Sequence, residues 1–69
     1  MTPNGTAIRA IREAQRLSIR GLALRTGLNR GYLSRLERGH IRESADHKVR
    51  AIAAVLDVPV DAITHKETP

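Results

Sequence analysis

The 69-residue chain contains no cysteine, no phenylalanine and no tryptophan. Without cysteine it can form neither a disulfide framework nor a cysteine zinc site. Its three histidines are far apart and lack the spacing of metal ligands. No apolar run approaches the roughly 18 residues that cross a bilayer, and no segment resembles a signal peptide. We therefore expect a cytoplasmic domain with no metal, cofactor, small-molecule ligand or membrane contact.

Acidic residues are also scarce. Twelve Lys and Arg stand against seven Asp and Glu, which gives a net charge of +5, and ten of the twelve basic residues are arginine. Such an excess is typical of proteins that bind nucleic acid or an acidic membrane surface. A basic domain without such a partner is the remaining alternative. Enzyme activity is not expected, because no His, Asp and Ser share a face and so small a chain has little room for a cleft.

Because aromatic residues are nearly absent, Leu, Ile, Val and Ala must form the core, and their spacing is helical. The pattern predicts an all-α fold of five short helices. One domain is expected over residues 1–64, followed by a polar C-terminal tail over residues 65–69. The helices are expected at residues 6–16, 19–26, 30–38, from a cap at Ser44 or Asp46 to near Leu56, and 60–64.

The second and third predicted helices are joined by a very short turn. Ser18 and Asn29 are the expected N-caps of these helices, and Gly27 ends the first of them. Two helices joined so tightly cross steeply, as in a helix-turn-helix unit, here residues 19–38. Ala23 lies where the two helices approach most closely. The leucines expected beneath the pair are Leu22, Leu28, Leu33 and Leu36.

The third predicted helix has an outer face with three arginines and no acid. A helix of this kind fits the DNA major groove, with its N-terminal residues nearest the base edges. Arg30 and Arg35 are predicted to read guanine, Ser34 to contact a base or a phosphate, and Arg38 to contact the backbone. A solvated arginine face is the alternative interpretation.

Two residues of this helix have two interpretations each. Tyr32 lies between the inner and outer faces, so it either packs half into the core or contacts a phosphate or a thymine methyl group. Gly31 costs about 1 kcal/mol of helix stability relative to alanine. It either permits close approach to a large partner or is merely tolerated in the first turn.

Residues 8–63 resemble the lambda-repressor-like, Cro and XRE-type helix-turn-helix family. The resembling segments are IRAIREAQRLS, GLALRTGLNRGYLSRLERG and VRAIAAVLDVPVDAI. The resemblance implies a five-helix domain whose third helix reads DNA, with phosphate contacts near the start of the second helix and after the third. It also implies an ion pair between Arg12 and Glu37, which makes Glu37 structural. The positions that match base-contacting residues of the family are Arg30, Gly31, Ser34 and Arg35.

The chain departs from the family pattern in three places. Ile19 stands where the family often has a phosphate-binding glutamine, so Ser18 and Arg20 are predicted to replace that contact. Gly31 stands where a base-reading side chain is common, so specificity is expected to rest on the arginines and on DNA shape. The loop after the third helix lacks the family's common proline, and Arg42 and Lys48 are predicted to reach phosphates from there.

The leading hypothesis is a sequence-specific, double-stranded DNA-binding transcriptional regulator, a repressor or Cro-like switch. Sixty-nine residues leave no room for a ligand-sensing domain, which favours a small Cro-type phage or mobile-element regulator. The alternative is an antitoxin or protein-interaction module on the same fold. A homodimer on a palindromic operator is also expected. Its predicted surface is Val58, Pro59, Val60 and Ile63, unless these residues simply cap the core.

Overall fold

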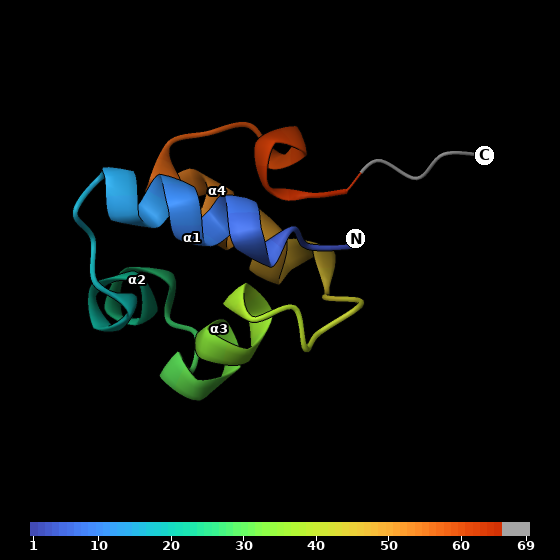
Figure 1. Cartoon of the computed structure of the whole chain (residues 1–69), viewed down its shortest axis with the longest axis horizontal. Coiled ribbons are helices and arrows are strands. Elements are labelled where there is room, and N and C mark those ends of the chain that lie inside the picture. Colours follow the sequence, from blue (N-terminus) through green and yellow to red (C-terminus); the bar gives the residue numbers. More distant parts are fainter. Residues whose placement is uncertain (66–69) are drawn as a thin grey trace.

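The computed structural model describes residues 1–65, which form four α-helices and one 3₁₀-helix and contain no sheet strand (Figure 1). The predicted all-α fold is confirmed, and four of the five predicted helices are α-helices. The last predicted helix is a single 3₁₀ turn, because the chain is extended again at Thr64, which forms an isolated bridge with Pro3. The elements are α1 (Gly5–Ala14), α2 (Ile19–Thr26), α3 (Arg30–Glu37), α4 (Asp46–Leu56) and η1 (Val60–Ile63).

The C-terminal part of the predicted tail, from residue 66 on, lies outside the described residues. His65, which was assigned to this tail, donates its backbone N–H to the carbonyl oxygen of Thr2 at 2.9 Å. The backbone N–H of Asn4 donates to the carbonyl oxygen of Ile63 at 2.8 Å. These bonds hold the first residues of the chain beside the end of η1.

Side chains cap the first three helices. Asn4, Ser18 and Asn29 each accept a hydrogen bond from a backbone N–H in the first turn, at 3.1, 2.9 and 3.1 Å. These bonds satisfy N–H groups that would otherwise have no partner, and each such cap contributes about 1 kcal/mol. The N-caps predicted at Ser18 and Asn29 are therefore confirmed.

The start of α4 differs from the prediction. Its N-cap residue is Ala45, which makes no side-chain hydrogen bond, and Asp46 is the first helical residue. Ser44 is buried, with 8% of its surface exposed, and its hydroxyl is hydrogen-bonded to the hydroxyl of Tyr32. Neither Ser44 nor Asp46 caps the helix, because the tertiary structure uses the Ser44 hydroxyl elsewhere.

The core draws on every helix. Helix α1 packs against α3 and η1, α2 packs against α3 and α4, and α4 packs against η1. Ile63 is completely buried, so it caps the core, and its predicted place in a dimer surface is wrong. Val58 and Val60 pack against the core but remain partly exposed. The buried apolar residues are Ile8, Leu22, Leu33, Leu36, Val49, Ile52, Ala53, Leu56 and Ile63.

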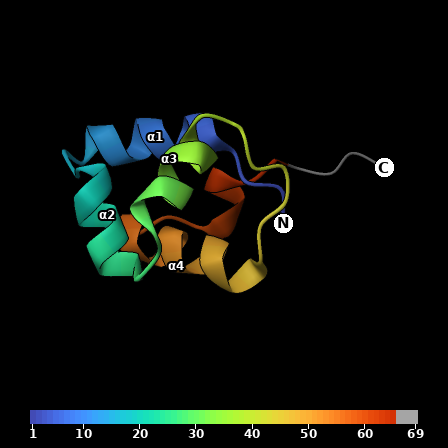
Figure 2. The same ribbon diagram turned by 90° about the horizontal axis from the view of Figure 1, so that it is seen from below.

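Helices α2 and α3 form one face of the molecule. They lie along the lower side in Figure 1 and face the viewer in Figure 2, while α1, α4 and η1 lie behind them. The fold therefore presents the short α2–α3 pair on one outer surface.

Within residues 1–65, no helix has the length and apolar character that crossing a membrane requires.

Gly5 allows a close approach between the start of α1 and the end of α3. A Cβ atom at this position would lie 2.8 Å from the carbonyl oxygen of Glu37, and still closer to that of Leu36. Both obstructing atoms belong to the backbone, so no side-chain rotation could make room. Gly5 therefore helps to fix the position of α3, a role that the sequence pattern did not indicate.

Candidate nucleic-acid interface

The turn between α2 and α3 is fixed by local hydrogen bonds. Gly27 adopts the left-handed conformation, with φ of 75°, and donates its N–H to the carbonyl oxygen of Ala23 at 2.9 Å. The Thr26 hydroxyl donates to the carbonyl oxygen of Leu22 at 2.7 Å and accepts from the N–H of Leu28 at 3.2 Å. Glycine adopts this backbone conformation at little cost. The turn predicted at Gly27 is confirmed, and Thr26 is an additional brace.

An ion pair joins the inner edge of α3 to α1. Arg12 Nε donates to Glu37 Oε2 at 2.7 Å, and Arg12 Nη2 donates to Glu37 Oε1 at 2.9 Å. Arg12 Nη1 also donates to the carbonyl oxygen of Leu17 at 2.8 Å. The hydrogen bonds to Glu37 raise the pKa of Arg12 above its ordinary value. The ion pair that the family resemblance implies is therefore present, and it ties both α1 and the α1–α2 connection to α3.

The opposite face of α3 points to solvent. Arg30, Gly31, Arg35 and Arg38 are exposed and Ser34 is half-buried, whereas Leu33 and Leu36 are buried. Within residues 1–65, none of these three arginines forms an ion pair. The structure thus brings together the five residues that were predicted to line the outer face of this helix.

Several acidic side chains are engaged elsewhere in the molecule. Glu13 Oε1 lies 2.7 Å from Arg9 Nε on α1. The N-terminal ammonium group lies 3.2 Å from Glu43 Oε2 and 3.4 Å from Asp46 Oδ1. Together with Glu37, these residues compensate basic groups away from the outer face of α3. The positive charge of that face therefore remains available to an anionic partner.

The residues predicted to contact phosphate surround α3 on several elements. Ser18 and Arg20 are exposed at the start of α2, Arg42 is exposed in the loop after α3, and Lys48 is half-buried in the first turn of α4. The Ser18 hydroxyl already accepts a hydrogen bond from the N–H of Gly21. The backbone at the start of α2 is therefore more available to a phosphate than this hydroxyl. The wide spacing of these residues suits an extended, repeating anion.

Tyr32 packs against the α3–α4 loop and α4. Its side chain is half-buried, its hydroxyl is hydrogen-bonded to Ser44, and Lys48 Nζ lies 4.7 Å from the centre of its ring. This distance is typical of a cation–π contact. These contacts favour the interpretation in which Tyr32 is half-packed. They also show a partner for Ser44 that the sequence pattern did not indicate.

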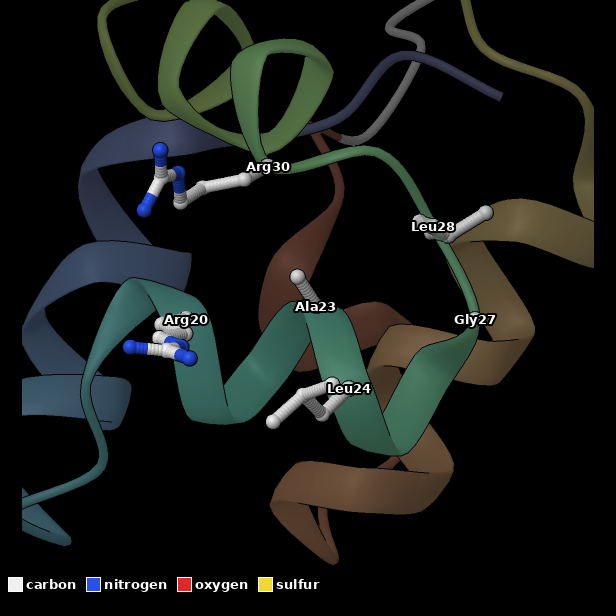
Figure 3. A pocket seen from close by; sticks show the side chains of 6 residues that line it. All are labelled: Arg20, Ala23, Leu24, Gly27, Leu28 and Arg30. Carbon is white, nitrogen blue, oxygen red and sulfur yellow. The ribbon is translucent and has the colours of Figure 1, made fainter.

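A groove of about 390 Å³ follows the outer side of the α2–α3 pair. Figure 3 shows its six lining residues, with the side chains of Arg20 and Arg30 extending to the same side from α2 and from the start of α3. Leu24 lies on its α2 wall with 77% of its surface exposed. We call this feature the α2–α3 groove; its lining residues are Arg20, Ala23, Leu24, Gly27, Leu28 and Arg30.

An all-α domain with two short helices joined by such a turn, the second of them basic on its outer face, is a helix-turn-helix domain. Residues 8–63 match the model of the HTH_3 helix-turn-helix family, and the chain belongs to this family. The match spans α3, the turn before it and the Arg12–Glu37 ion pair. The family and the relatives described next are transcriptional regulators, not enzymes.

The chain is 31% identical over 61 residues to RghRB of Bacillus subtilis (strain 168), an uncharacterised HTH-type transcriptional regulator. That alignment covers 88% of this chain but only 44% of RghRB, so the chain spans less than half the length of this relative. The folded domain is thus the shared part of the two proteins.

Two solved structures are similar over most of their length. One is the crystal structure of SinR, the master regulator for biofilm formation, from Bacillus subtilis, in complex with DNA. It is 32% identical, with a TM-score of 0.78, covering 81% of this chain and 89% of that one. The other is the restriction-modification controller protein C.AhdI from Aeromonas hydrophila. It is 33% identical, with a TM-score of 0.78, covering 84% of this chain and 86% of that one.

Proposed function

We propose that this protein regulates transcription by binding double-stranded DNA sequence-specifically, with α3 in the major groove. The observation that carries the proposal is the outer face of α3, where Arg30, Arg35 and Arg38 are exposed without an acidic partner in residues 1–65. The opposite face of the helix is anchored by buried leucines and by the Arg12–Glu37 ion pair. A rigidly held basic helix of this kind suits the major groove. The similarity to SinR, which was solved with DNA, supports this assignment.

Arg30 and Arg35 are the proposed base readers. Both are exposed on α3, and Arg30 is its first residue, where recognition helices come nearest the base edges. An arginine can donate two hydrogen bonds to O6 and N7 of guanine. Ser34 lies between them in sequence and can donate to a base or a phosphate. Gly31 has no side chain to read a base, so its contribution is close approach of the backbone.

Positive groups around α3 are the proposed phosphate contacts. Arg20 and the backbone at Ser18 face one strand from α2, and Arg38 lies at the end of α3. Arg42 and Lys48 follow in the α3–α4 loop and in α4, where Tyr32 packs against Lys48. The Tyr32 hydroxyl is hydrogen-bonded to Ser44, and the Tyr32 ring lies beneath Lys48 Nζ, so the proposed part of Tyr32 in phosphate binding is to hold Lys48 in place.

Selection of duplexes from a random DNA pool at two salt concentrations tests the proposal directly. We expect one enriched sequence that contains guanines, and an affinity that falls steeply with salt. The slope of log K against log salt should be about −0.9 for each phosphate neutralised. A pool that yields no common sequence, or binding that is indifferent to salt, contradicts the proposal.

Arg30→Gln tests base readout against simple charge. Loss of a bidentate contact to guanine costs about 1–3 kcal/mol, which corresponds to a loss of about 5- to 150-fold in affinity for the selected duplex and relaxed specificity at one position. Arg50→Gln is the matched control, because Arg50 is exposed on α4, outside the α2–α3 pair. Equal losses for the two variants would reduce the role of Arg30 to net charge.

We further propose that two copies bind a palindromic operator. The proposed contact surface is Val58, Pro59 and Val60, which are partly or fully exposed after α4. One short recognition helix covers few base pairs, and two-fold dimers on half-sites about one helical turn apart extend the contact. Val58→Lys should shift the protein to monomer in sedimentation equilibrium and weaken binding to the palindrome more than to a half-site. An unchanged mass distribution would place the dimer contact elsewhere.

A cytoplasmic regulator of the Cro type, from a phage or another mobile element, is the biological setting that we propose. The genes that flank the coding sequence test it, since a phage switch protein lies beside a divergent promoter and an opposing repressor gene. An antitoxin role predicts instead a neighbouring toxin gene and a stoichiometric protein complex.

A further inference from the structure

The α2–α3 groove has a feature that the proposed DNA contacts do not explain. Leu24 is 77% exposed, and among residues 1–65 it is the one large hydrophobic side chain that is exposed to solvent. Single exposed leucines are common on protein surfaces, but this one lines a groove whose rim carries two arginines without an ionic partner in residues 1–65. A groove of about 390 Å³ is large enough to take one or two side chains.

The two parts of the groove favour different chemical groups. Ala23, Leu24, Gly27 and Leu28 form its apolar part, and the Gly27 N–H is already bonded to Ala23, so this part has little to offer a phosphate. An apolar side chain fits there instead. The DNA backbone carries charge along its whole length and matches such a surface poorly.

The rim of the groove is strongly basic. Arg20 and Arg30 extend to the same side of it, and neither forms an ion pair within the described chain (Figure 3). Guanidinium groups bind carboxylates through paired hydrogen bonds. The charge of the rim therefore favours a ligand with acidic groups placed beside its apolar side chain.

We propose that the α2–α3 groove docks an acidic, apolar segment of another protein, and that this segment excludes DNA. A large apolar side chain of the segment packs between Leu24 and Leu28, and its carboxylates bind Arg20 and Arg30. Exclusion rests on the proposed function, because Arg30 is the proposed base reader and Arg20 a proposed phosphate contact. The groove would then be the site at which a protein inhibitor releases the regulator from its operator.

Peptide selection tests the docking site without DNA. The probe is a library of random twelve-residue peptides displayed on phage, selected against the immobilised wild-type protein. We expect enriched peptides that combine a large apolar residue with neighbouring Asp or Glu. In fluorescence anisotropy, Leu24→Gln should weaken their binding by about tenfold or more, because the leucine no longer buries apolar surface. Arg25→Gln is the matched control on the same helix, since Arg25 is exposed and does not line the groove.

Competition with the duplex selected from the random DNA pool tests the second half of the proposal. The duplex should displace the peptide, and Leu24→Gln should bind the duplex as the wild type does. Absence of enriched peptides, or equal binding of peptide by Leu24→Gln and the wild type, overturns the docking site. Weaker duplex binding by Leu24→Gln also overturns it, because the apolar part of the groove would then belong to the DNA interface. Simultaneous binding of peptide and duplex overturns the exclusion.

Failure of the proposed function gives a different result. In that case the wild type binds no duplex from the pool, whereas the peptides still bind and still depend on Leu24. This outcome supports the docking site and removes only its competition with DNA.

Discussion

Glu37→Ala should destabilise the domain strongly, because it leaves the Arg12 guanidinium without its carboxylate. The side chains are 13% and 7% exposed for Arg12 and Glu37, so little water can replace the lost partner. Removing one member of a buried ion pair costs about 3–5 kcal/mol. Arg12 keeps its hydrogen bond to the carbonyl oxygen of Leu17, which places the expected loss near the lower limit, about 3 kcal/mol.

A loss of this size is large for so small a domain. Total stability is about 0.05–0.15 kcal/mol per residue, so a domain of this size has roughly 3–10 kcal/mol in all. Each kcal/mol shifts the melting temperature by about 4–8 °C in small domains, so a decrease of at least about 12 °C is expected. Thermal and urea unfolding followed by far-ultraviolet circular dichroism measure both quantities.

Two further variants separate the ion pair from general effects of the substitution. Glu13→Ala breaks the exposed Arg9–Glu13 pair and removes a longer contact of 3.9 Å between Glu13 Oε1 and Arg12 Nη2, and it should change the melting temperature little, because exposed pairs contribute little. The double variant Arg12→Met, Glu37→Leu replaces the charges by apolar groups and should recover much of the loss. An unchanged melt of Glu37→Ala, accompanied by lost DNA binding, would refute the structural role and make Glu37 part of the interface.

Three other predictions concern the helix ends and acid stability. Gly5→Ala should lower the free energy of unfolding by about 2–3 kcal/mol in urea titration, because its Cβ would meet the backbone at the end of α3; a wild-type midpoint would contradict the close approach. Arg16 has φ of 56° after α1, a left-handed conformation that costs a non-glycine residue about 1–2 kcal/mol, so Arg16→Gly should raise the melting temperature by a few degrees; a lower melting temperature would count against this reasoning. Hydrogen bonding to Arg9 lowers the pKa of Glu13 below its ordinary 4.5, so the contribution of this pair is present above that pH and is lost as the pH falls through the folded-state pKa. Glu13→Gln should therefore lose less stability than the wild type in acid titrations, and parallel curves would show that the pair does not contribute.

Local sequence signals were sufficient to predict most of the helices and the turn at the centre of the site. Ser18, Asn29 and Gly27 act through neighbours three or four residues away, so their roles follow from local chemistry. The same holds for the inner and outer faces of α3, since helical periodicity alone separates Leu33 and Leu36 from the arginines. The predicted fifth helix is present only as a 3₁₀ turn, because the chain becomes extended at Thr64, which forms a bridge with Pro3, a residue distant in sequence.

Residues with two competing partners could not be assigned from the sequence. Ser44 is a good helix cap by type, yet it bonds Tyr32, twelve residues earlier in the chain. The Tyr32 hydroxyl therefore has a partner within the domain, which its position in α3 did not indicate. Gly5 and Leu24 show no local signal at all, because the role of each depends on which surface lies opposite it.

The sequence by itself determined the helical class, the short α2–α3 turn and the acid-free outer face of α3, because these depend on residue type and on spacing within a few turns. The tertiary structure decided how α3 is held: Gly5 lets α1 approach the end of α3, and the Arg12–Glu37 ion pair, which the family resemblance implied, joins two segments far apart in the chain. It also decided that Ile63 is buried and that Arg20, Leu24 and Arg30 line one groove. Burial and shared surfaces arise only when separate helices pack together, so no local pattern can specify them.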